Sequence, residues 1–366
     1  LIEGVMGLFD GSPSAADLAR HFGVPVLAVV DASAMAGTFG ALAYGLRHYR
    51  PGLPWAGVLA NRVGSARHAD MLRDGLQDAD DWMGALMRVQ PGNAPLAAKA
   101  GAALLPERHL GLVAAHELDD SLQRLDAAAD ALAATPLGQM TLEDLQRWAV
   151  DFPAPASTVA VPALLAGRTV AVGRDAAFCF IYAANAQCLE QMGARVVFFS
   201  PLRDAALPDC DAVWLPGGYP ELHTERIAAN TSMKASLMAH VLQRKPLWAE
   251  CGGMMALFES ITHTDGTVHP AWGLLPGHVR MQKRLAALGP QQLVVDGHTL
   301  RGHTFHYSTA QSDAPVVSRT SRPDEPVAAD AGEALYRLGS IHASYFHAWF
   351  PSSPVAVARL LGGVTA

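Results

Sequence analysis

Residues 246–257, PLWAECGGMMAL, decide the fold of the half of the chain that contains them. An apolar run with strand character ends at Glu250, Cys251 stands at the turn, and two glycines permit the tight backbone from which a helix begins. This order predicts a nucleophile elbow with Cys in place of Ser. A thiol at a helix N-terminus feels the positive end of the helix dipole, which favours the thiolate, and the N–H groups that follow, starting at Gly252, can hold an oxyanion. The alternative is a structural Cys in an ordinary strand-to-helix turn, which the flanking glycines make less favoured.

The residues on both sides of this turn alternate between strand and helix patterns from residue 168 to the C-terminus. Before the elbow we expect strands at 169–174, 195–200 and 212–218, and helices at 178–193 and 225–244. Beyond about residue 272 the chain carries short, turn-bounded runs of β character at 300–308, 334–340 and 342–350. These runs predict a sheet that closes over the first strands.

A second Gly-rich turn, LPGGYPELH at 215–223, also follows a strand and precedes a helix. Gly217 and Gly218 could therefore bring another N–H group to the same oxyanion, although the motif is weak by itself. A Cys nucleophile also needs a base. Of the fifteen histidines, the candidates are those in strand-like runs near the C-terminus, although a His in a strand is more often structural. They are His303, His306, His342 and His347.

The first half of the chain has a βαβ rhythm of its own. We expect strands at 25–33 and 55–63, a helix ending near Leu46, another starting near Arg67, and helix over 116–150. Three prolines in DFPAPASTVAVPALLAG mark a linker at 152–167. The sequence therefore predicts an α/β protein of two domains, residues 1–151 and 168–366.

Composition excludes several classes of protein. Half of the residues are hydrophobic and 17% are charged, which suits sheets covered by helices on both faces. A net charge of -7 without a Lys/Arg-rich run argues against nucleic acid as a partner. No apolar stretch reaches the roughly 18 residues that cross a bilayer, and no basic start marks a secretion signal, so we expect a cytoplasmic protein that does not contact membranes. The four cysteines form no C-x-x-C pair, so any special Cys must act alone.

The second half resembles the class I glutamine amidotransferase domain of the cobyrinic acid synthase type, with a flavodoxin-like fold. The resemblance includes AECGGMMAL and, in the family's order, VGRDAAFCFIY, FFSPLRD, LPGGYPELH, RGHTFHYS and ASYFHAWF. It implies that Cys251 attacks the glutamine amide and that His347 is the base. It also implies that His303, His306 and Tyr307 lie in a segment facing the acceptor substrate. The usual triad has Glu two residues after the base, but Trp349 stands there, so the third member stays open.

The first half contains no G-x-x-x-x-G-K-[ST]. However, EGVMGLFDG at 3–11 resembles the segment that follows the P-loop strands in the same synthetase family. The resemblance implies that Glu3 serves a metal and Asp10 the acceptor, and Mg²⁺ requires such oxygen ligands. Solvated carboxylates in an N-terminal turn are the alternative. Because Leu1 is not Met and the first residues read as a strand entering a Gly-rich turn, we expect an upstream phosphate-binding segment that this sequence lacks.

The stretch VLANRVGSARH at 58–68 places an amide just past a strand end, where nucleotide bases are often recognised. By itself, Asn61 could equally cap a loop. The family resemblance favours adenine recognition by Asn61, with Arg62, Ser65 and His68 in the loop nearby.

Both halves together resemble the cobyrinic and hydrogenobyrinic acid a,c-diamide synthase family. The resemblance implies a ligase that uses ATP, Mg²⁺ and L-glutamine to amidate the a and c acetate carboxylates of a corrin tetrapyrrole. The alternatives are amidation of nickel sirohydrochlorin, or a glutaminase or regulatory fragment without synthetase activity. The branch of the pathway, the order of amidation and the oligomeric state, with a homodimer as one option, stay open.

Overall fold

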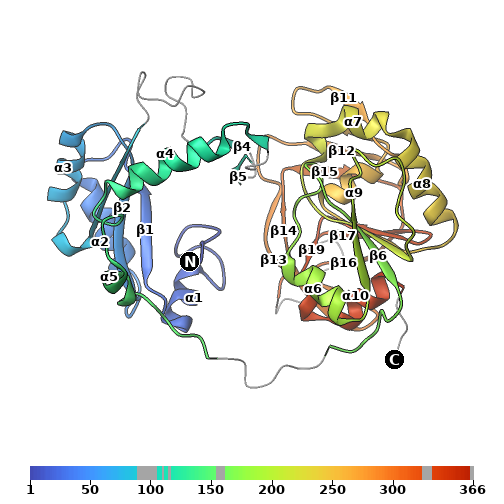
Figure 1. The fold of residues 1–366 in the computed structure, drawn as a ribbon, viewed down its shortest axis with the longest axis horizontal. Helices are drawn as coiled ribbons and strands as arrows, with labels where there is room; N and C mark the ends of the chain where they lie inside the picture. Colours follow the sequence, from blue (N-terminus) through green and yellow to red (C-terminus); the bar gives the residue numbers. More distant parts are fainter. Residues whose placement is uncertain (89–104, 109–110, 114–116, 154–160, 324–331, 363–366) are drawn as a thin grey trace. The chain divides into compact units, whose positions relative to one another are not determined.

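A computed structural model describes residues 1–366 apart from 89–104, 109–110, 114–116, 154–160, 324–331 and 363–366 (Figure 1). The chain forms two compact units, Leu1–Ala156 and Ser157–Ala366. Both units are built from parallel strands and helices, which confirms the predicted α/β class. Of the predicted linker 152–167, residues 154–160 lie outside the described residues.

The first unit has a three-stranded parallel sheet in the order β1-β2-β3. Its elements are α1 (Ala15–Phe22), β1 (Val26–Asp31), α2 (Thr38–His48), β2 (Trp55–Val63), α3 (Ala66–Asp74), η1 (Ala79–Asp81), β3 (Trp82–Met87), β4 (Glu107–Arg108), β5 (Gly111–Leu112), α4 (Ser121–Ala133) and α5 (Leu142–Gln146). A small core that includes Phe39, Val58 and Leu72 joins the sheet to α2 and α3. Because β1 and β2 pair in parallel with Asp31 opposite Asn61, their carboxyl ends meet at one edge.

Two predictions for this unit are wrong in detail. Residues 1–10 form turns and bends instead of the end of a strand, because exposed residues such as Leu1 and Val5 gain no burial from an extended conformation. The helical stretch expected at 116–150 is broken between α4 and α5, where Pro136 cannot continue a helix.

The second unit centres on a seven-stranded sheet in the order β16-β17-β18-β9-β8-β6-β7, in which β18 to β7 are parallel. Its elements up to the elbow are β6 (Thr169–Gly173), α6 (Ala183–Gln191), β7 (Arg195–Phe199), β8 (Ala212–Leu215), η3 (Pro220–His223), α7 (Thr224–Ala229), α8 (Thr231–Leu242), β9 (Leu247–Glu250) and α9 (Gly252–Leu257). Those beyond it are β10 (Ser260–Thr262), β11 (Val268–Pro270), β12 (His278–Met281), β13 (Ala287–Val295), β14 (His298–His306), β15 (Ser308–Gln311), β16 (Val316–Arg319), β17 (Ala334–Leu338), β18 (Ile341–Ser344), β19 (His347–Ala348), η4 (Phe350–Ser352) and α10 (Pro354–Leu360).

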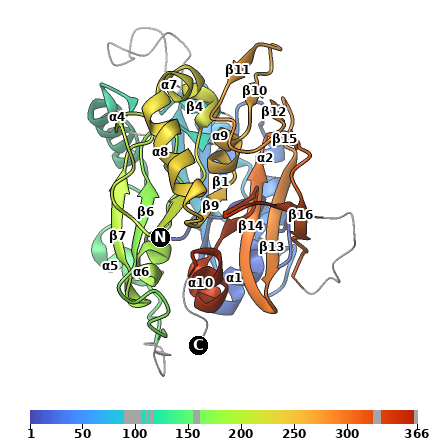
Figure 2. The ribbon, with the colours of Figure 1, turned by 90° about the vertical axis from the view of Figure 1, so that its right-hand side faces the viewer.

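Helices cover both faces of this sheet (Figures 1 and 2). On one face, Trp214 and Trp248 pack with residues of α6 and α10, such as Leu189 and Val357. On the other face, residues of α8 and α9 pack with Phe258 and with Trp272. The strands β8 and β9 are completely buried, as apolar runs without alternation predict.

Two predicted helices of this unit differ from those observed. The helix expected at 225–244 is divided into α7 and α8 at Asn230, whose side chain accepts a hydrogen bond from Met233 N and so starts a new helix. The helix expected at 178–193 begins only at Ala183, because Phe180 instead forms a β-bridge with Gly217.

The predicted C-terminal runs divide between two places. The run at 334–340 and the first part of 342–350 become β17 and β18 of the seven-stranded sheet, so they do not form a separate covering sheet as expected, whereas 300–308 and 347–348 contribute to two additional sheets, β11-β10-β12-β15 and β13-β14-β19. In the second of these, His303 of β14 lies directly opposite His347 of β19. Among the described residues, no helix combines the length and the apolar character that a membrane span requires.

Candidate active site

Cys251 occupies a sharp turn between β9 and α9. Its backbone has φ 44° and ψ -107°, a conformation that residues other than Gly seldom adopt and that costs energy. The turn is held by a hydrogen bond of 2.7 Å from Cys251 N to Ser344 O at the end of β18. The strand, strained turn and helix form the elbow that the sequence predicts.

The two Gly-rich turns pack directly against each other. A Cβ atom added to Gly252 would lie 2.8 Å from Gly218 N, and one added to Gly253 would overlap Leu215 O. Gly218 itself has φ 157° and leaves no room for a side chain beside Ala177 O. Side chains at these positions would force the turns apart, so the glycines keep the N–H groups near Cys251 close together.

His347 lies beside the same turns. Its ring stacks on the ring of His303, with centroids 4.8 Å apart and planes inclined by 10°. A Cβ atom on Gly217 would overlap the ring carbon Cε1 and lie 3.0 Å from Nδ1. The 217–218 turn therefore touches both the residue that follows Cys251 and the ring of His347.

Burial sets the protonation of both candidate catalytic groups. Burial, with smaller contributions from His303 and His306, lowers the pKa of His347 to about 3, so the imidazole is neutral and able to accept a proton. Desolvation also raises the pKa of Cys251 far above its ordinary value, and the Glu221 carboxylate adds to the rise, whereas the Gly252 N–H opposes it. The prediction that the helix terminus favours the Cys251 thiolate is therefore wrong for the resting site. The rise in pKa caused by burial is larger than the lowering by one N–H group and a short helix.

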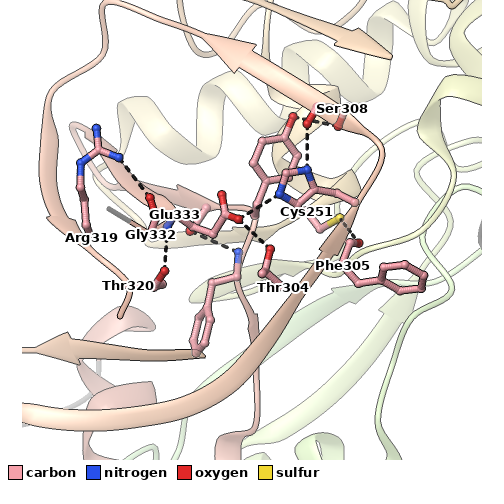
Figure 3. A network of polar contacts seen from close by, with 12 residues as sticks. Cys251, Thr304, Phe305, Ser308, Arg319, Thr320, Gly332 and Glu333 are labelled. Atoms are coloured by element: carbon pink, nitrogen blue, oxygen red, sulfur yellow. Dashed lines mark hydrogen bonds and ion pairs between the residues drawn. The ribbon is translucent and has the colours of Figure 1, made fainter. Parts of the chain in front are cut away.

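His306 belongs to a buried polar network with Thr304, Ser308 and Glu333. Figure 3 shows Thr304, Ser308 and Glu333 in the same region as Cys251. The Nε2 atom of His306 lies 3.0 Å from Glu333 Oε1 and its Nδ1 lies 2.8 Å from Ser308 O, so both ring nitrogens face acceptors. Burial alone would raise the pKa of Glu333, but the hydrogen bond and charge of His306, with a hydrogen bond from Thr304, bring it below its usual value. Glu333 therefore accepts hydrogen bonds from His306 and Thr304 as a carboxylate.

This network is connected to the thiol and to the strand that precedes His347. The Cys251 thiol lies 4.0 Å from the carbonyl of Phe305, the neighbour of His306. The His306 ring stacks on Tyr345 with centroids 3.7 Å apart, and the Tyr345 hydroxyl bonds Ser308 Oγ at 2.8 Å. Sequence reasoning missed Glu333, because it follows His306 by 27 residues and belongs to no motif.

The side chains predicted for nucleotide binding lie at the carboxyl edge of the first unit's sheet. Asn61 Oδ1 accepts a hydrogen bond from Arg62 N at 2.8 Å, and Arg62, with φ 61°, forms an ion pair with Asp31 at 3.4 Å. Arg88, which sequence reasoning did not select, donates to Arg62 O at 3.0 Å and to Ser33 O at 3.1 Å. The carboxyl edge of a parallel sheet is where such folds bind ligands.

Ser65 and His68 hold the loops of this edge. Ser65 Oγ accepts a hydrogen bond from His68 N and caps α3. His68 Nδ1 accepts from Gly64 N at 3.2 Å, so Nε2 carries the proton and donates to Met35 O at 2.7 Å. Both side chains thereby fix the loop that follows Asn61.

Glu3 and Asp10 belong to the exposed N-terminal loop, where Asp10 N donates to Gly7 O at 2.9 Å. No hydrogen bond or ion pair within the described part of the chain joins them to the Asn61 loop. No group of three His, Cys, Asp or Glu side chains suited to a metal occurs among the described residues either. One or two carboxylates still suit Mg²⁺, which takes its other ligands from water and phosphates.

Comparison with known proteins matches both halves of the chain. Residues 169–355 match the model of the CobB/CobQ-like glutamine amidotransferase domain. Hydrogenobyrinate a,c-diamide synthase of Stutzerimonas stutzeri is 51% identical over 361 residues, which cover 99% of this chain and 79% of that protein. Cobyrinate a,c-diamide synthase of Herminiimonas arsenicoxydans is 43% identical over 98% of this chain and 77% of its own length. A solved glutamine amidotransferase, 20% identical, covers 52% of this chain and 96% of its own with a TM-score of 0.38.

Proposed function

Because the chain belongs to the family of hydrogenobyrinate and cobyrinate a,c-diamide synthases, we propose that it amidates the a and c acetate carboxylates of a corrin ring. Glutamine supplies the nitrogen and ATP activates each carboxylate. The second unit releases ammonia from glutamine, and the first unit uses it. The reaction takes place in the cytoplasm.

Cys251 and His347 carry the glutaminase reaction. The Cys251 sulfur attacks the amide carbon of glutamine while neutral His347 takes the thiol proton. The N–H groups of the two Gly turns, at Gly217, Gly218 and Gly252, stabilise the oxyanion that forms. His347 then gives the proton to the departing nitrogen, which leaves ammonia and a thioester. Water hydrolyses the thioester to glutamate and restores the thiol, with His347 again moving the proton.

The buried, neutral state of His347 supports this division of roles. A base must be unprotonated before the reaction, and burial keeps the pKa of His347 low, at about 3. The two ring nitrogens of His306 instead contact Glu333 and Ser308, so His306 has a structural role in the site. His303 and His306 lie in the last part of β14 and Tyr307 directly follows it, in the segment for which the resemblance implies contact with the acceptor.

The first unit performs the amidation. ATP transfers its γ-phosphoryl group to the corrin carboxylate, and ammonia attacks the resulting acyl phosphate, which expels inorganic phosphate and leaves the amide. Mg²⁺ would supply positive charge that stabilises the phosphate groups. Glu3 would hold the metal and Asp10 would position the acceptor. Asn61 would read adenine with its amide NH₂ group, because its oxygen already accepts from Arg62 N. Arg62, Ser65 and His68 keep this edge in place.

The contact of the 217–218 turn with the Cys251 elbow on one side and with the His347 ring on the other is the observation that carries the proposal. The test measures glutamate release from glutamine, and ATP-dependent amidation of hydrogenobyrinic acid, cobyrinic acid and nickel sirohydrochlorin. Amidation of either corrin supports the proposal and identifies the branch. Amidation of nickel sirohydrochlorin alone would replace the substrate, and glutamate release without any amidation would reduce the protein to a glutaminase.

A further inference from the structure

We propose that Glu250 is a positioning residue of the glutaminase site, which holds His347 through the backbone of Ala348. It takes the place of the acid that is absent at position 349. The inference rests on the proposed glutaminase function and names a residue that acts through the base without touching glutamine.

Glu250 connects the strand of the nucleophile to the strand of the base. It is the last residue of β9, directly before Cys251, and it is only 2% exposed. Its Oε1 atom accepts a hydrogen bond of 2.7 Å from Trp248 Nε1 and one of 3.3 Å from Ala348 N. Because Ala348 follows His347, this carboxyl restrains the backbone from which the His347 ring projects.

Asn185 holds the same segment from another side. Its Nδ2 donates to Ala348 O at 2.8 Å and its Oδ1 accepts from Phe350 N at 2.8 Å, and the side chain is completely buried. The pairing of β19 with β14 adds the stack of His303 on His347. The position and direction of the His347 side chain are therefore determined by its backbone and by a ring stack.

The residue at the usual acid position cannot perform this task. Trp349 is 41% exposed, and its ring packs against Tyr182 with centroids 5.6 Å apart. An indole cannot accept the proton of an imidazole N–H in the way that a carboxylate does. The hydrogen bond from Ala348 N to Glu250 orients the His347 side chain instead, through the peptide group that follows it.

Burying the Glu250 carboxyl group costs free energy of folding, which a role in the active site would explain. No Lys or Arg of the described chain forms an ion pair with Glu250, and burial raises its pKa to about 8, although hydrogen bonds from Trp248 and Ala348 oppose the rise. Below that pH the group is a neutral acid. The titratable groups around it are Cys251 at the turn that follows it, Tyr182 before α6, and His347 next to Ala348. Its charge raises the pKa of both Cys251 and Tyr182.

These contacts predict a signature in the pH dependence. Above a pH of about 8, Glu250 ionises, and the new negative charge next to Cys251 disfavours the thiolate that attacks glutamine. The kcat for glutamine hydrolysis should therefore fall on the alkaline side because of Glu250. A residue with a purely structural role would not shift this limb of the profile.

The experiment compares glutamine hydrolysis by the full chain and by its Glu250→Leu and Glu250→Gln variants from pH 6 to pH 10. Glu250→Leu leaves Ala348 N without its acceptor, so kcat should fall about 10-fold to 100-fold while KM for glutamine changes by less than about 3-fold. Glu250→Gln keeps an acceptor oxygen, so it should recover most of that loss and should remove the decline above about pH 8. Glu259→Gln, at an exposed carboxyl two residues beyond α9, is the control and should behave as the unchanged protein.

A second measurement does not depend on turnover. The rate of alkylation of Cys251 by iodoacetamide, with Cys251→Ala as the background, reports the ionisation of the thiol at each pH. In Glu250→Gln the thiol should ionise at a lower pH than in the unchanged protein. Unchanged kcat in Glu250→Leu, or identical pH profiles and alkylation rates in Glu250→Gln, would overturn the assignment. Failure of the unchanged protein to hydrolyse glutamine would instead overturn the proposed function.

Discussion

The replacement of Gly217 by Ala tests whether His347 is the base of the glutaminase site. The φ of Gly217 lies outside the left-handed region, so Ala is compatible with the backbone there. The added Cβ would overlap His347 Cε1 and lie 3.0 Å from Nδ1, with Phe180 Cδ2 at 3.2 Å on its other side. Atoms that do not share a hydrogen bond pack at about 3.5 Å, so the ring must move by at least about 0.5 Å, and by more at Cε1.

This displacement should affect catalysis more than stability. A misplacement approaching 1 Å costs about 100-fold in rate, so kcat for glutamine hydrolysis should fall by about one to two orders of magnitude. Overpacking at one buried site costs about 1–3 kcal/mol of unfolding free energy, which a urea titration would measure. Amidation with ammonium chloride as the nitrogen source should persist, because that reaction bypasses His347.

Gly45→Ala is the matched control. Gly45 lies in α2 with nothing within 4 Å of an added Cβ, so the change should leave glutamine hydrolysis unaffected. A folded Gly217→Ala variant that hydrolyses glutamine at the full rate would refute the reasoning, because the base could not then be the ring beside Gly217.

Three further predictions concern the other proposed roles. Cys251→Ala should abolish glutamine-dependent amidation and leave ammonia-dependent amidation intact; loss of both in a folded variant would contradict the division of labour between the units. Asp10→Asn should impair amidation with either nitrogen source, and unchanged ammonia-dependent turnover would remove Asp10 from the synthetase site. Glu333→Gln tests the buried pair of Glu333 and His306. The pKa of Glu333 in the folded protein lies below its ordinary value of 4.5, so the carboxylate stabilises the fold above pH 4.5. This stabilisation is lost as the pH falls through the folded-state pKa. The difference in unfolding free energy between the unchanged protein and Glu333→Gln, measured by urea titration from pH 7 to pH 3, should therefore shrink as the pH falls; a constant difference would show that Glu333 is not an ionised partner of His306.

The chain's own sequence determined much of the fold and the centre of the candidate site. Apolar runs without alternation predicted the buried strands β8 and β9, because parallel strands covered on both faces have no solvent side. The glycines around Cys251 predicted a sharp turn, because only residues without a side chain fit where two turns touch. Local patterns of this kind depend only on neighbouring residues, so they can be recognised without knowledge of the tertiary structure.

Sequence reasoning failed where a local pattern met a tertiary contact. The expected helix 225–244 is divided because Asn230 caps a second helix, and the expected helix 178–193 starts late because Phe180 pairs with Gly217. The Phe180 bridge forms only in the folded chain. The Asn230 cap on Met233 N is local, but the same side chain also donates to Pro201 O and Asp204 O, which are distant in the sequence.

The partners of the catalytic groups were decided by the tertiary structure alone. Spacing could not select His347 from the other C-terminal histidines, and only the family resemblance favoured it. The carboxyl groups of Glu250 and Glu333 contact Ala348 and His306 across 98 and 27 residues of sequence. The pKa of Cys251 also rises, against the expectation from the helix terminus, because desolvation by the packed core outweighs one N–H group. Residue type and order determine which chemistry is available, whereas burial and contacts between distant strands determine its protonation and its geometry.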